Sequence, residues 1–529
     1  MNKPVDEVFW VTDYQAKGDG ESVDTSAIQA AIDACHRAGG GRVVLPPGRY
    51  VTSTLYLKDQ VRLCLQGGAE LLGSRKAADY PMDNPGSGEI GEPCSGEVLS
   101  GNEYIQALIV AHKASNVAIE GPGVIDGRGQ QDAFPALING KKDGTQRPML
   151  IRFVQCTNIR FHQVTLKDAS SWCLHLVDCD DVHIQAIKIS NRANRNNDGI
   201  DLDGCGNVFI ADCQISAKDD AICLKSSSGR SCENVFVRNC VLSSDTAGIK
   251  LGTSSRAGFK NVIVSDCVIR KTAMAGIKLI CVDGGTLDNV HMHDLVMEDV
   301  EGPIFIRLGN RGAAYFTPEP DGGPIPVGCL RNVTLRNIQA RVRLAPPDTD
   351  EVQEHLRPFL RGGPRTRLGM LMTGIPGHPL TGLKLDNIDI LFPGLGDVDP
   401  RQPPVPDDEK RYPEQCFFGP LPAYGLFLRH AEDVELSRIR LRYEGHEKRP
   451  SMILDDVHDC SLKDVTLQAD GACAMQMQSV SDIAVSGCRV RGKPASLIAA
   501  DAEDQSRICL DHNRLDQGTQ PFSLPSSTI

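Results

Sequence analysis

The chain has 529 residues, of which 41% are hydrophobic and 23% charged, the composition of an ordinary folded, water-soluble protein. Acidic residues outnumber basic ones by 68 to 56, which argues against a nucleic acid as the main partner. No apolar run approaches the roughly 18–20 residues that a membrane-spanning helix needs, so we expect no membrane partner either.

The 19 cysteines are odd in number and include no pair separated by two residues. This pattern favours buried, reduced thiols over a disulfide framework or a zinc site, and therefore a reducing compartment. The segment 1–10 lacks the apolar stretch of a secretory signal. We expect a cytoplasmic protein for the chain as given, and a periplasmic or secreted one if a signal has been removed.

The first predicted element is a capping helix. Residues 24–26 offer N-cap side chains, and Ile28, Ile32 and Cys35 then share one helical face. A run of three glycines ends the helix, and a short strand follows. We expect about residues 1–50 to form a cap that covers the open sheet edge of the structure behind it.

A repeated segment dominates the rest of the chain, with copies spaced 23, 26, 27, 27 and 28 residues apart. In each copy apolar and polar residues alternate over a short strand. A repeat of this length with period-2 alternation is typical of a parallel β-solenoid, and the Leu-dense consensus of leucine-rich repeats is absent. The copies begin at Asn158, Asp181, Asn207, Asn234, Asn261 and Asn289.

We predict one domain over residues 1–529, with coils from about 50 to 515. Long insertions rich in Gly and Pro interrupt these coils at about 309–329, 345–380 and 392–424. Loops of this length are usually functional walls or disordered segments.

A second strand of each coil can be aligned on an inward aliphatic residue. Because side chains alternate along a strand, the residue after each inward position points outward. The inward ladder is Leu174, Ile200, Ile222, Ile249, Ile277 and Ile304, and the outward ladder is His175, Asp201, Cys223, Lys250, Lys278 and Phe305.

This alignment places four acids, Asp198, Asp201, Asp219 and Asp220, on two adjacent coils. Stacking like charges costs free energy, so we favour a functional site over a solvated acidic turn or a bound cation. Both Asp219 and Asp220 can face one cleft only if the chain bends there. Paired carboxylates suit glycoside hydrolysis, and one coil of separation can give the roughly 6.5–9.5 Å that inverting enzymes keep.

The motif Asn196-Asn197-Asp198-Gly199-Ile200-Asp201, followed by Asp219-Asp220, resembles the polygalacturonases of glycoside hydrolase family 28. The likeness extends to segments 16–35, 121–129 and 420–430. It implies an all-β, right-handed parallel β-helix and an inverting hydrolase of pectic chains that needs no cofactor. By this resemblance Asp219 is the general acid, while Asp198 and Asp220 hold and activate the water.

Two positions depart from the family pattern. The family's Gly-His-Gly falls at Ala247-Gly248, where only Thr246 and Lys250 are near in sequence. The family's Arg-Ile-Lys becomes Gly276-Ile277-Lys278, which keeps the lysine and loses the arginine. The acid trio is complete, and a changed substrate is the interpretation we favour.

Further residues are predicted to bind substrate. The outward ladder supplies several of them, and a structural hydrogen bond or a solvated charge is the alternative role for each. Trp172 can stack on a sugar or pack against a loop. The predicted set is Asn196, Asp201, Lys250, Lys278, His175, Lys225 and Arg307.

We expect a polygalacturonase-like hydrolase of an acidic polysaccharide or oligosaccharide, monomeric and without a metal. The long insertions suggest a cleft closed at one end, and hence exo action. Two alternatives remain open at this point. A β-helix lyase or epimerase would use Lys250 and Lys278 beside the acids, and a non-catalytic glycan-binding solenoid would explain the missing histidine and arginine.

Overall fold

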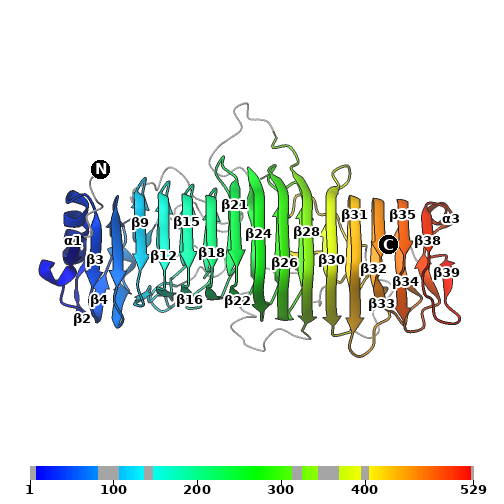
Figure 1. Ribbon diagram of the computed structural model, residues 1–529, viewed down its shortest axis with the longest axis horizontal. Helices are drawn as coiled ribbons and strands as arrows, with labels where there is room; N and C mark the ends of the chain where they lie inside the picture. Colours follow the sequence, from blue (N-terminus) through cyan, green and yellow to red (C-terminus); the bar gives the residue numbers. More distant parts are fainter. Residues whose placement is uncertain are drawn as a thin grey trace. The chain divides into compact units, whose positions relative to one another are not determined.

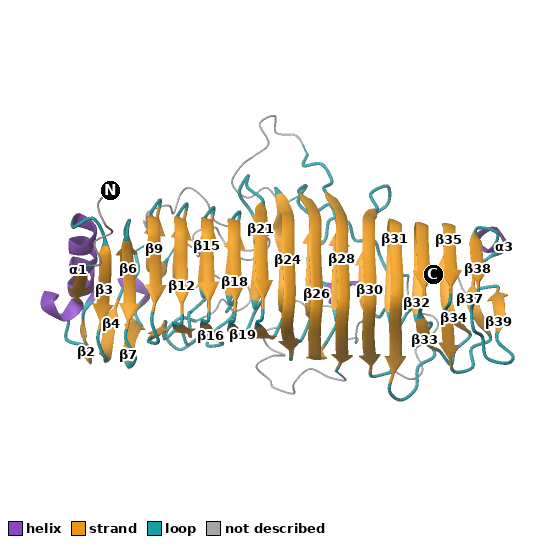
Figure 2. Ribbon diagram, in the orientation of Figure 1, coloured by secondary structure: helices purple, strands orange, loops and turns teal. Residues whose placement is uncertain are grey.

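The computed structural model describes residues 7–81, 106–135, 147–312, 324–343, 369–394 and 404–525. Nearly all of its elements are β-strands that pair in parallel between successive coils. The chain is the right-handed parallel β-helix that the sequence predicts (Figures 1 and 2). None of the helices in the described ranges is long and apolar enough to cross a membrane.

The described residues divide into two compact units. The first holds the chain up to Ile249 together with Arg256–Phe259, and the second holds Lys250–Ser255 and the described residues from Lys260 onward. That 1–529 form a single domain stays a prediction. Much of the three predicted insertions, namely residues 313–323, 344–368 and 395–403, lies outside the described residues.

Three parallel sheets make up the coils of the first unit. The first sheet contains β1 (Val8–Trp10), β3 (Gly41–Leu45), β6 (Val61–Leu65), β9 (Ser115–Glu120), β12 (Thr157–His162), β15 (Asp180–Gln185), β18 (Gly206–Ala211) and β21 (Cys232–Arg238). The second contains β2 (Asp19–Val23), β4 (Gly48–Thr52), β7 (Ala69–Gly73), β10 (Val124–Asp126), β13 (Thr165–Lys167), β16 (Lys188–Asn191), β19 (Gln214–Ala217) and β22 (Val241–Ser244). The third contains β5 (Leu55–Leu57), β8 (Ala107–His112), β11 (Met149–Val154), β14 (Leu174–Val177), β17 (Ile200–Asp203) and β20 (Ile222–Ser226).

The register of the third sheet agrees with the alignment made from the sequence. Leu174 pairs with Ile200, and Ile200 pairs with Ile222. These three side chains are fully buried inside the coils. In the second unit Ile277 pairs with Ile304, as predicted. The aliphatic ladder is therefore the core of the solenoid, and its register fixes which side chains lie side by side.

Asparagine recurs in the repeat because one position near the start of the first-sheet strand of each coil has a left-handed backbone. The φ angle is +54° at Asn207 and +57° at Asn234, a region that Asn and Asp tolerate better than other residues with a side chain. The amide groups also bond along the stack, since Asn234 donates to Asn207 at 3.1 Å and Asn207 donates to Asp181 at 3.1 Å. In the second unit Asn289 donates to Asn261 at 2.7 Å.

The predicted capping helix is α1 (Thr25–Arg37), and it lies beside β3 at the N-terminal end of the first unit (Figure 1). Ile28, Ile32 and Cys35 are fully buried on one face, as expected. Asp24 occupies the N-cap position, but its carboxylate accepts from the backbone N–H groups of Lys17 and Gly18 rather than from the helix. The short helices η1 (Val11–Tyr14) and η2 (Ala77–Asp79) belong to the same unit.

Longer strands build the second unit. One run of paired strands contains β25 (Ala275–Cys281), β27 (Ile304–Leu308), β29 (Met370–Thr373), β31 (Leu426–Tyr443), β32 (Met452–Lys463), β34 (Cys473–Gln478), β37 (Ser496–Ala499) and β39 (Gln520–Ser523). A second run adds β26 (Thr286–Val300), β28 (Cys329–Val342), β30 (Leu380–Phe392), β35 (Ser481–Ser486) and β38 (Ile508–Asp511). The remaining elements are β23 (Ala247–Ser255), β24 (Gly258–Arg270), β33 (Thr466–Gln468), β36 (Arg489–Arg491), η3 (Gln415–Phe418) and α3 (Ala502–Gln505).

The cysteines of the described residues are all free thiols, in agreement with the expectation from their spacing. Cys179, Cys205 and Cys232 are fully buried at equivalent places in successive coils. Burial raises the pKa of the Cys179 and Cys232 thiols well above the ordinary value, so these thiols are neutral filler inside the coils.

Candidate functional site

The predicted acids meet at one corner of the first unit, where the chain passes from the second sheet into the third. Asp198 lies between β16 and β17, and Asp219 and Asp220 lie between β19 and β20. Carboxylate oxygens of the three acids lie within 4.8 Å of one another. Thr246 lies at the same corner of the following coil, between β22 and β23.

A bend at Asp219 brings both neighbouring acids into the cluster. The backbone N–H groups of Lys218 and Asp219 both donate to the carbonyl oxygen of Asn197, at 3.1 and 3.2 Å. The backbone N–H of Asp220 donates to Oδ1 of Asp219 at 3.0 Å. These contacts interrupt the alternation of the strand, so the bend that the sequence analysis required is present.

The bend turns Asp219 and Asp220 to the same side, opposite Asp198 of the adjacent coil. One carboxylate oxygen of each acid therefore lies within 4.8 Å of the other two. The roughly 6.5–9.5 Å of inverting glycosidases is a separation between whole carboxyl groups, so the predicted spacing stays a prediction.

Buried asparagines hold the turn that carries Asp198. The amide of Asn197 donates to the carbonyl oxygens of Ala169 and Ser171, at 2.9 and 2.7 Å. The amide of Asn191 donates to the carbonyl oxygens of Ser171 and Asp198, at 3.0 and 2.8 Å. Both asparagine side chains are fully buried, so their hydrogen bonds fix the backbone of the turn in place.

The three acids differ in exposure. Asp198 is 3% exposed and Asp220 is 1% exposed, whereas Asp219 is only partly buried. Burial raises the pKa of the Asp198 carboxyl well above its ordinary value, and the negative charges of Asp201 and Asp219 raise it further. Oδ1 of Asp198 is buried and has no hydrogen-bond partner among the described residues. It is an acceptor or donor site that a small polar molecule would satisfy.

Thr246 is a site residue whose role the sequence analysis did not assign. Its hydroxyl group lies 2.6 Å from Oδ1 of Asp220 and 3.1 Å from Oδ1 of Asp219. The backbone N–H of Ala247 also donates to Oδ1 of Asp220, at 3.2 Å. The only sequence signal was the position of Thr246, next to the place where the family pattern has a histidine.

Three predicted substrate residues, two of the outward ladder and Lys225, form a buried polar layer instead of a surface. His175 and Asp201 are fully buried, and Lys225 is 5% exposed. The ammonium group of Lys225 lies 3.6 Å from Oδ1 of Asp201 and 4.6 Å from the centre of the Trp172 ring. These residues point away from the coil interior as predicted, but they pack against one another.

The imidazole of His175 is neutral in this layer. Burial lowers its pKa well below the ordinary value, and the positive charges of Arg152 and Lys225 act in the same direction. The ring of Trp172 packs edge-on against it, with centroids 4.9 Å apart. Trp172 is 3% exposed, so it packs within the protein and does not present a face for sugar stacking.

Asn196 lies beside the acid cluster in sequence and is partly exposed. Its Oδ1 accepts a hydrogen bond of 3.0 Å from the guanidinium group of Arg147. Arg147 also donates to the carbonyl oxygen of Arg195 at 2.8 Å. Arg147, which lies just before β11, thus holds the start of the acidic turn by hydrogen bonds. No sequence pattern predicted this contact.

The other predicted binding residues belong to the second unit. Lys250 is 6% exposed. Lys278 is 1% exposed, and its ammonium group pairs with Glu414 at 2.6 Å. Arg307 is also 1% exposed, and it donates to the carbonyl oxygens of Gly374, at 3.2 Å, and Asp407. Lys278 and Arg307 therefore have structural partners, and neither is the solvated charge considered above.

The acid cluster is also the group of carboxylates that best meets the geometry of a cation site in the described residues. Hard cations such as Ca²⁺ bind sets of carboxylate oxygens. In this cluster, however, one oxygen each of Asp219 and Asp220 already faces the hydroxyl of Thr246. The arrangement is that of carboxyl groups connected by a proton-bearing group.

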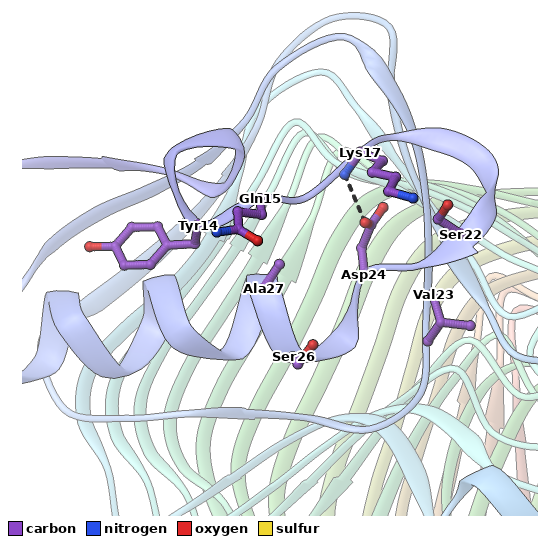
Figure 3. A pocket seen from close by; sticks show the side chains of 8 residues that line it. All are labelled: Tyr14, Gln15, Lys17, Ser22, Val23, Asp24, Ser26 and Ala27. Carbon is purple, nitrogen blue, oxygen red and sulfur yellow. Dashed lines mark hydrogen bonds between the residues drawn. The ribbon is translucent and has the colours of Figure 1, made fainter.

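A separate cavity of about 570 Å³ lies beside η1 and the start of α1 (Figure 3). Asp24 lines it, and its carboxylate is bonded to the backbone N–H of Lys17 at 2.8 Å. None of the predicted site residues lines this cavity, so it is not part of the acid cluster.

The comparisons with known proteins agree with the motif. Residues 95–347, which include the whole acid cluster, match the family model described as Glycosyl hydrolases family 28. A "Probable polygalacturonase" of Vitis vinifera is 30% identical over 221 residues, which cover 41% of this chain and 44% of the relative. The "Exo-poly-alpha-D-galacturonosidase" of Dickeya chrysanthemi is 28% identical over 264 residues, which cover 43% of each chain. This chain thus spans less than half the length of these two curated relatives.

A solved structure supports the fold. The hyperthermoactive exopolygalacturonase from Thermotoga maritima aligns with a TM-score of 0.56 at 21% identity, over 73% of this chain and 87% of that one. The predicted resemblance to family 28 and the predicted β-helix are both confirmed.

Proposed function

We propose that this protein is an inverting glycoside hydrolase that cleaves a pectic or other acidic polysaccharide or oligosaccharide, and that it acts from chain ends. One observation carries the proposal: three carboxyl groups lie within 4.8 Å, one of them partly exposed and two buried. Glycoside hydrolysis needs one carboxyl group that reaches the sugar and others that handle water.

Asp219 is the general acid in this proposal. It is the most exposed member of the cluster, so its carboxyl group can reach the glycosidic oxygen. Its proton passes to that oxygen while the bond to the anomeric carbon breaks. Asp198 and Asp220 are the other carboxyl groups in reach, and they lie on the side of Asp219 where a water molecule can be held.

Asp198 and Asp220 hold the water. At 3% and 1% exposure they are too buried to bond to a sugar carbon themselves, so each acts through a water molecule. Burial favours the neutral form of Asp198, because the pKa of its carboxyl is raised, so Asp198 orients the water. Asp220 takes the proton, and the oxygen of the water bonds to the anomeric carbon. Direct attack by water inverts the anomeric configuration.

Exo action rests on separate observations. The likeness to the exo-acting enzyme of Dickeya chrysanthemi favours it, as do the long insertions of the sequence. A product mixture made only of the terminal unit supports exo action, and one rich in mid-length oligomers contradicts it.

The test is incubation with polygalacturonate and related acidic glycans, with released reducing ends and ultraviolet-absorbing ends both measured. We expect reducing ends without unsaturation, formed as the inverted anomer in the first minutes by NMR, and abolished in Asp219→Asn. Asp13→Asn is the control, because Asp13 is an exposed acid in η1 of the same unit. Unsaturated ends would identify a lyase, and binding without any cleavage would identify a glycan-binding solenoid.

A further inference from the structure

The hydroxyl group of Thr246 bridges two of the three acids. Its Oγ1 lies 2.6 Å from Oδ1 of Asp220 and 3.1 Å from Oδ1 of Asp219, and its side chain is buried. A hydroxyl group has one proton to donate and two lone pairs with which to accept. It can therefore donate to one carboxylate while it accepts from the other carboxyl group, provided that this second group is protonated.

The surroundings of Thr246 fix its orientation. The backbone N–H of Thr246 donates to the hydroxyl oxygen of Ser244 at 2.8 Å, and the hydroxyl of Ser244 donates to the carbonyl oxygen of Asp219 at 2.5 Å. The proton of Ser244 is thus committed to the backbone. Oγ1 of Thr246 lies 3.4 Å from the hydroxyl oxygen of Ser244, farther than from either carboxyl group, so its proton is better placed for the two acids.

The shorter contact indicates the direction of the hydrogen bonds. Asp220 receives the closer approach of Thr246 and a second donor, the backbone N–H of Ala247 at 3.2 Å. Oδ1 of Asp219 also accepts from one backbone N–H, that of Asp220 at 3.0 Å, so the difference between the two acids lies in their distances to Oγ1 of Thr246. The longer contact to Asp219 is left for a bond in which the carboxyl group of Asp219 donates to Oγ1.

We propose that Thr246 is a positioning residue that places the proton on Asp219 and returns it there after each turnover. The inference rests on the proposed function and adds a step to it. Hydrolysis leaves Asp219 ionised and Asp220 protonated. Asp220 then gives its proton to Oγ1 of Thr246 while the hydroxyl of Thr246 gives its own proton to Asp219. Each group ends in its starting state, and no proton has to be exchanged with solvent.

The experiment compares Thr246→Val, which keeps the side-chain shape without the hydroxyl, with Thr246→Ser, which keeps the hydroxyl. Under the proposed function, we expect kcat of Thr246→Val to fall by about tenfold or more, with KM within about twofold of wild type. The alkaline limb of its kcat–pH profile should move to lower pH, because Asp219 loses its proton more readily. Thr246→Ser should recover most of the lost kcat and the original profile.

A merely structural role would lower the folded fraction, which thermal unfolding measures, and would leave the pH profile of the remaining activity unchanged. A Thr246→Val variant with wild-type kcat and a wild-type pH profile would overturn the relay. An inactive wild-type protein would overturn the proposed function instead.

Infrared titration of the protonated carboxyl band keeps the relay testable without activity. In the wild type, the band that disappears in Asp219→Asn should persist to higher pH than it does in Thr246→Val. Identical titrations of that band in the wild type and in Thr246→Val would contradict the proposed placement of the proton.

Discussion

Gly199 lies against the carbonyl oxygen of Ala221 in the next coil, so closely that a Cβ atom at position 199 would stand 2.3 Å from that oxygen. The same backbone segment is part of the sheet ladder, since the N–H of Gly199 donates to the carbonyl oxygen of Asp220 at 2.9 Å. Glycine is therefore required between Asp198 and the strand by close packing of two backbones.

The first prediction concerns this contact. Gly199→Ala must push β17 away from β20, because neither backbone can move without breaking ladder hydrogen bonds. We expect a loss of about 1–3 kcal/mol in the free energy of unfolding, measured in urea, together with loss of hydrolysis. Gly229→Ala is the matched control, since a Cβ there meets no atom within 4 Å. Equal stability of the two variants would contradict the packing argument.

A second prediction concerns the buried amide of Asn197. Asn197→Asp keeps the shape but replaces the donor to the carbonyl oxygens of Ala169 and Ser171 with a carboxylate oxygen. We expect a cost of at least about 1–3 kcal/mol in the free energy of unfolding. Asn234→Asp on the exposed asparagine ladder is the control, because Asp181 already occupies the equivalent position two coils away. A similar loss in the free energy of unfolding for both variants would contradict the idea that the buried amide of Asn197 stabilises the fold more than the exposed ladder does.

Asp198→Asn tests the electrostatic cost of the cluster. Because the pKa of Asp198 is raised in the folded state, the folded protein binds more protons than the unfolded chain above pH ~3.9, the ordinary pKa of aspartate. This contribution to stability is present at low pH and is lost as pH rises through the folded-state pKa. The amide variant has no such loss. We expect its melting temperature to exceed that of the wild type at pH 7, by an amount that shrinks towards pH 4, while its hydrolytic activity is lost.

The scale of that stabilisation is roughly 0.5–2 kcal/mol, the usual gain from relieving a strained site. Asp13→Asn provides the comparison, because Asp13 is an exposed acid of the same unit. A pH-independent difference between Asp198→Asn and wild type would contradict the assignment of a raised pKa.

The ion pair between Lys278 and Glu414 gives a fourth prediction. Lys278→Met leaves the carboxylate of Glu414, which is 3% exposed, without this partner, and should cost about 3–5 kcal/mol in the free energy of unfolding. The double variant Lys278→Met/Glu414→Leu should recover most of that loss. Steady-state kinetics of the double variant then decide the role of Lys278 in binding. If the double variant has the KM of the wild type, Lys278 has a structural role only. If its KM is raised, Lys278 also contacts the substrate.

The sequence predicted the repeat and its register because both depend on local rules. Alternation along the strands placed Leu174, Ile200 and Ile222 on one inward ladder, and the structure has them so paired. Asparagine at the left-handed turn marked the start of each copy. Such features are legible in one sequence because each coil obeys the same constraints as its neighbours.

The chemistry around the acids was less predictable. Alternation gave His175 and Asp201 an outward direction, but it could not say that Trp172 and Lys225 would bury them. That outcome depends on packing between side chains of different coils. The hydrogen bond from Thr246 to Asp220 could not be predicted for the same reason. A threonine at a turn has many possible partners, and its actual partner depends on how the coils stack.

Asp198, Asp219 and Thr246 each belong to a different coil, and they face one another only when three consecutive coils are stacked in register. A slip of one strand by a single residue would turn one of these groups to the other side of its sheet. The acid cluster and its contact with Thr246 therefore form only when these three coils are stacked in the correct register. Local fraying at this corner should abolish the proposed hydrolysis while most of the β-sheet signal in circular dichroism remains.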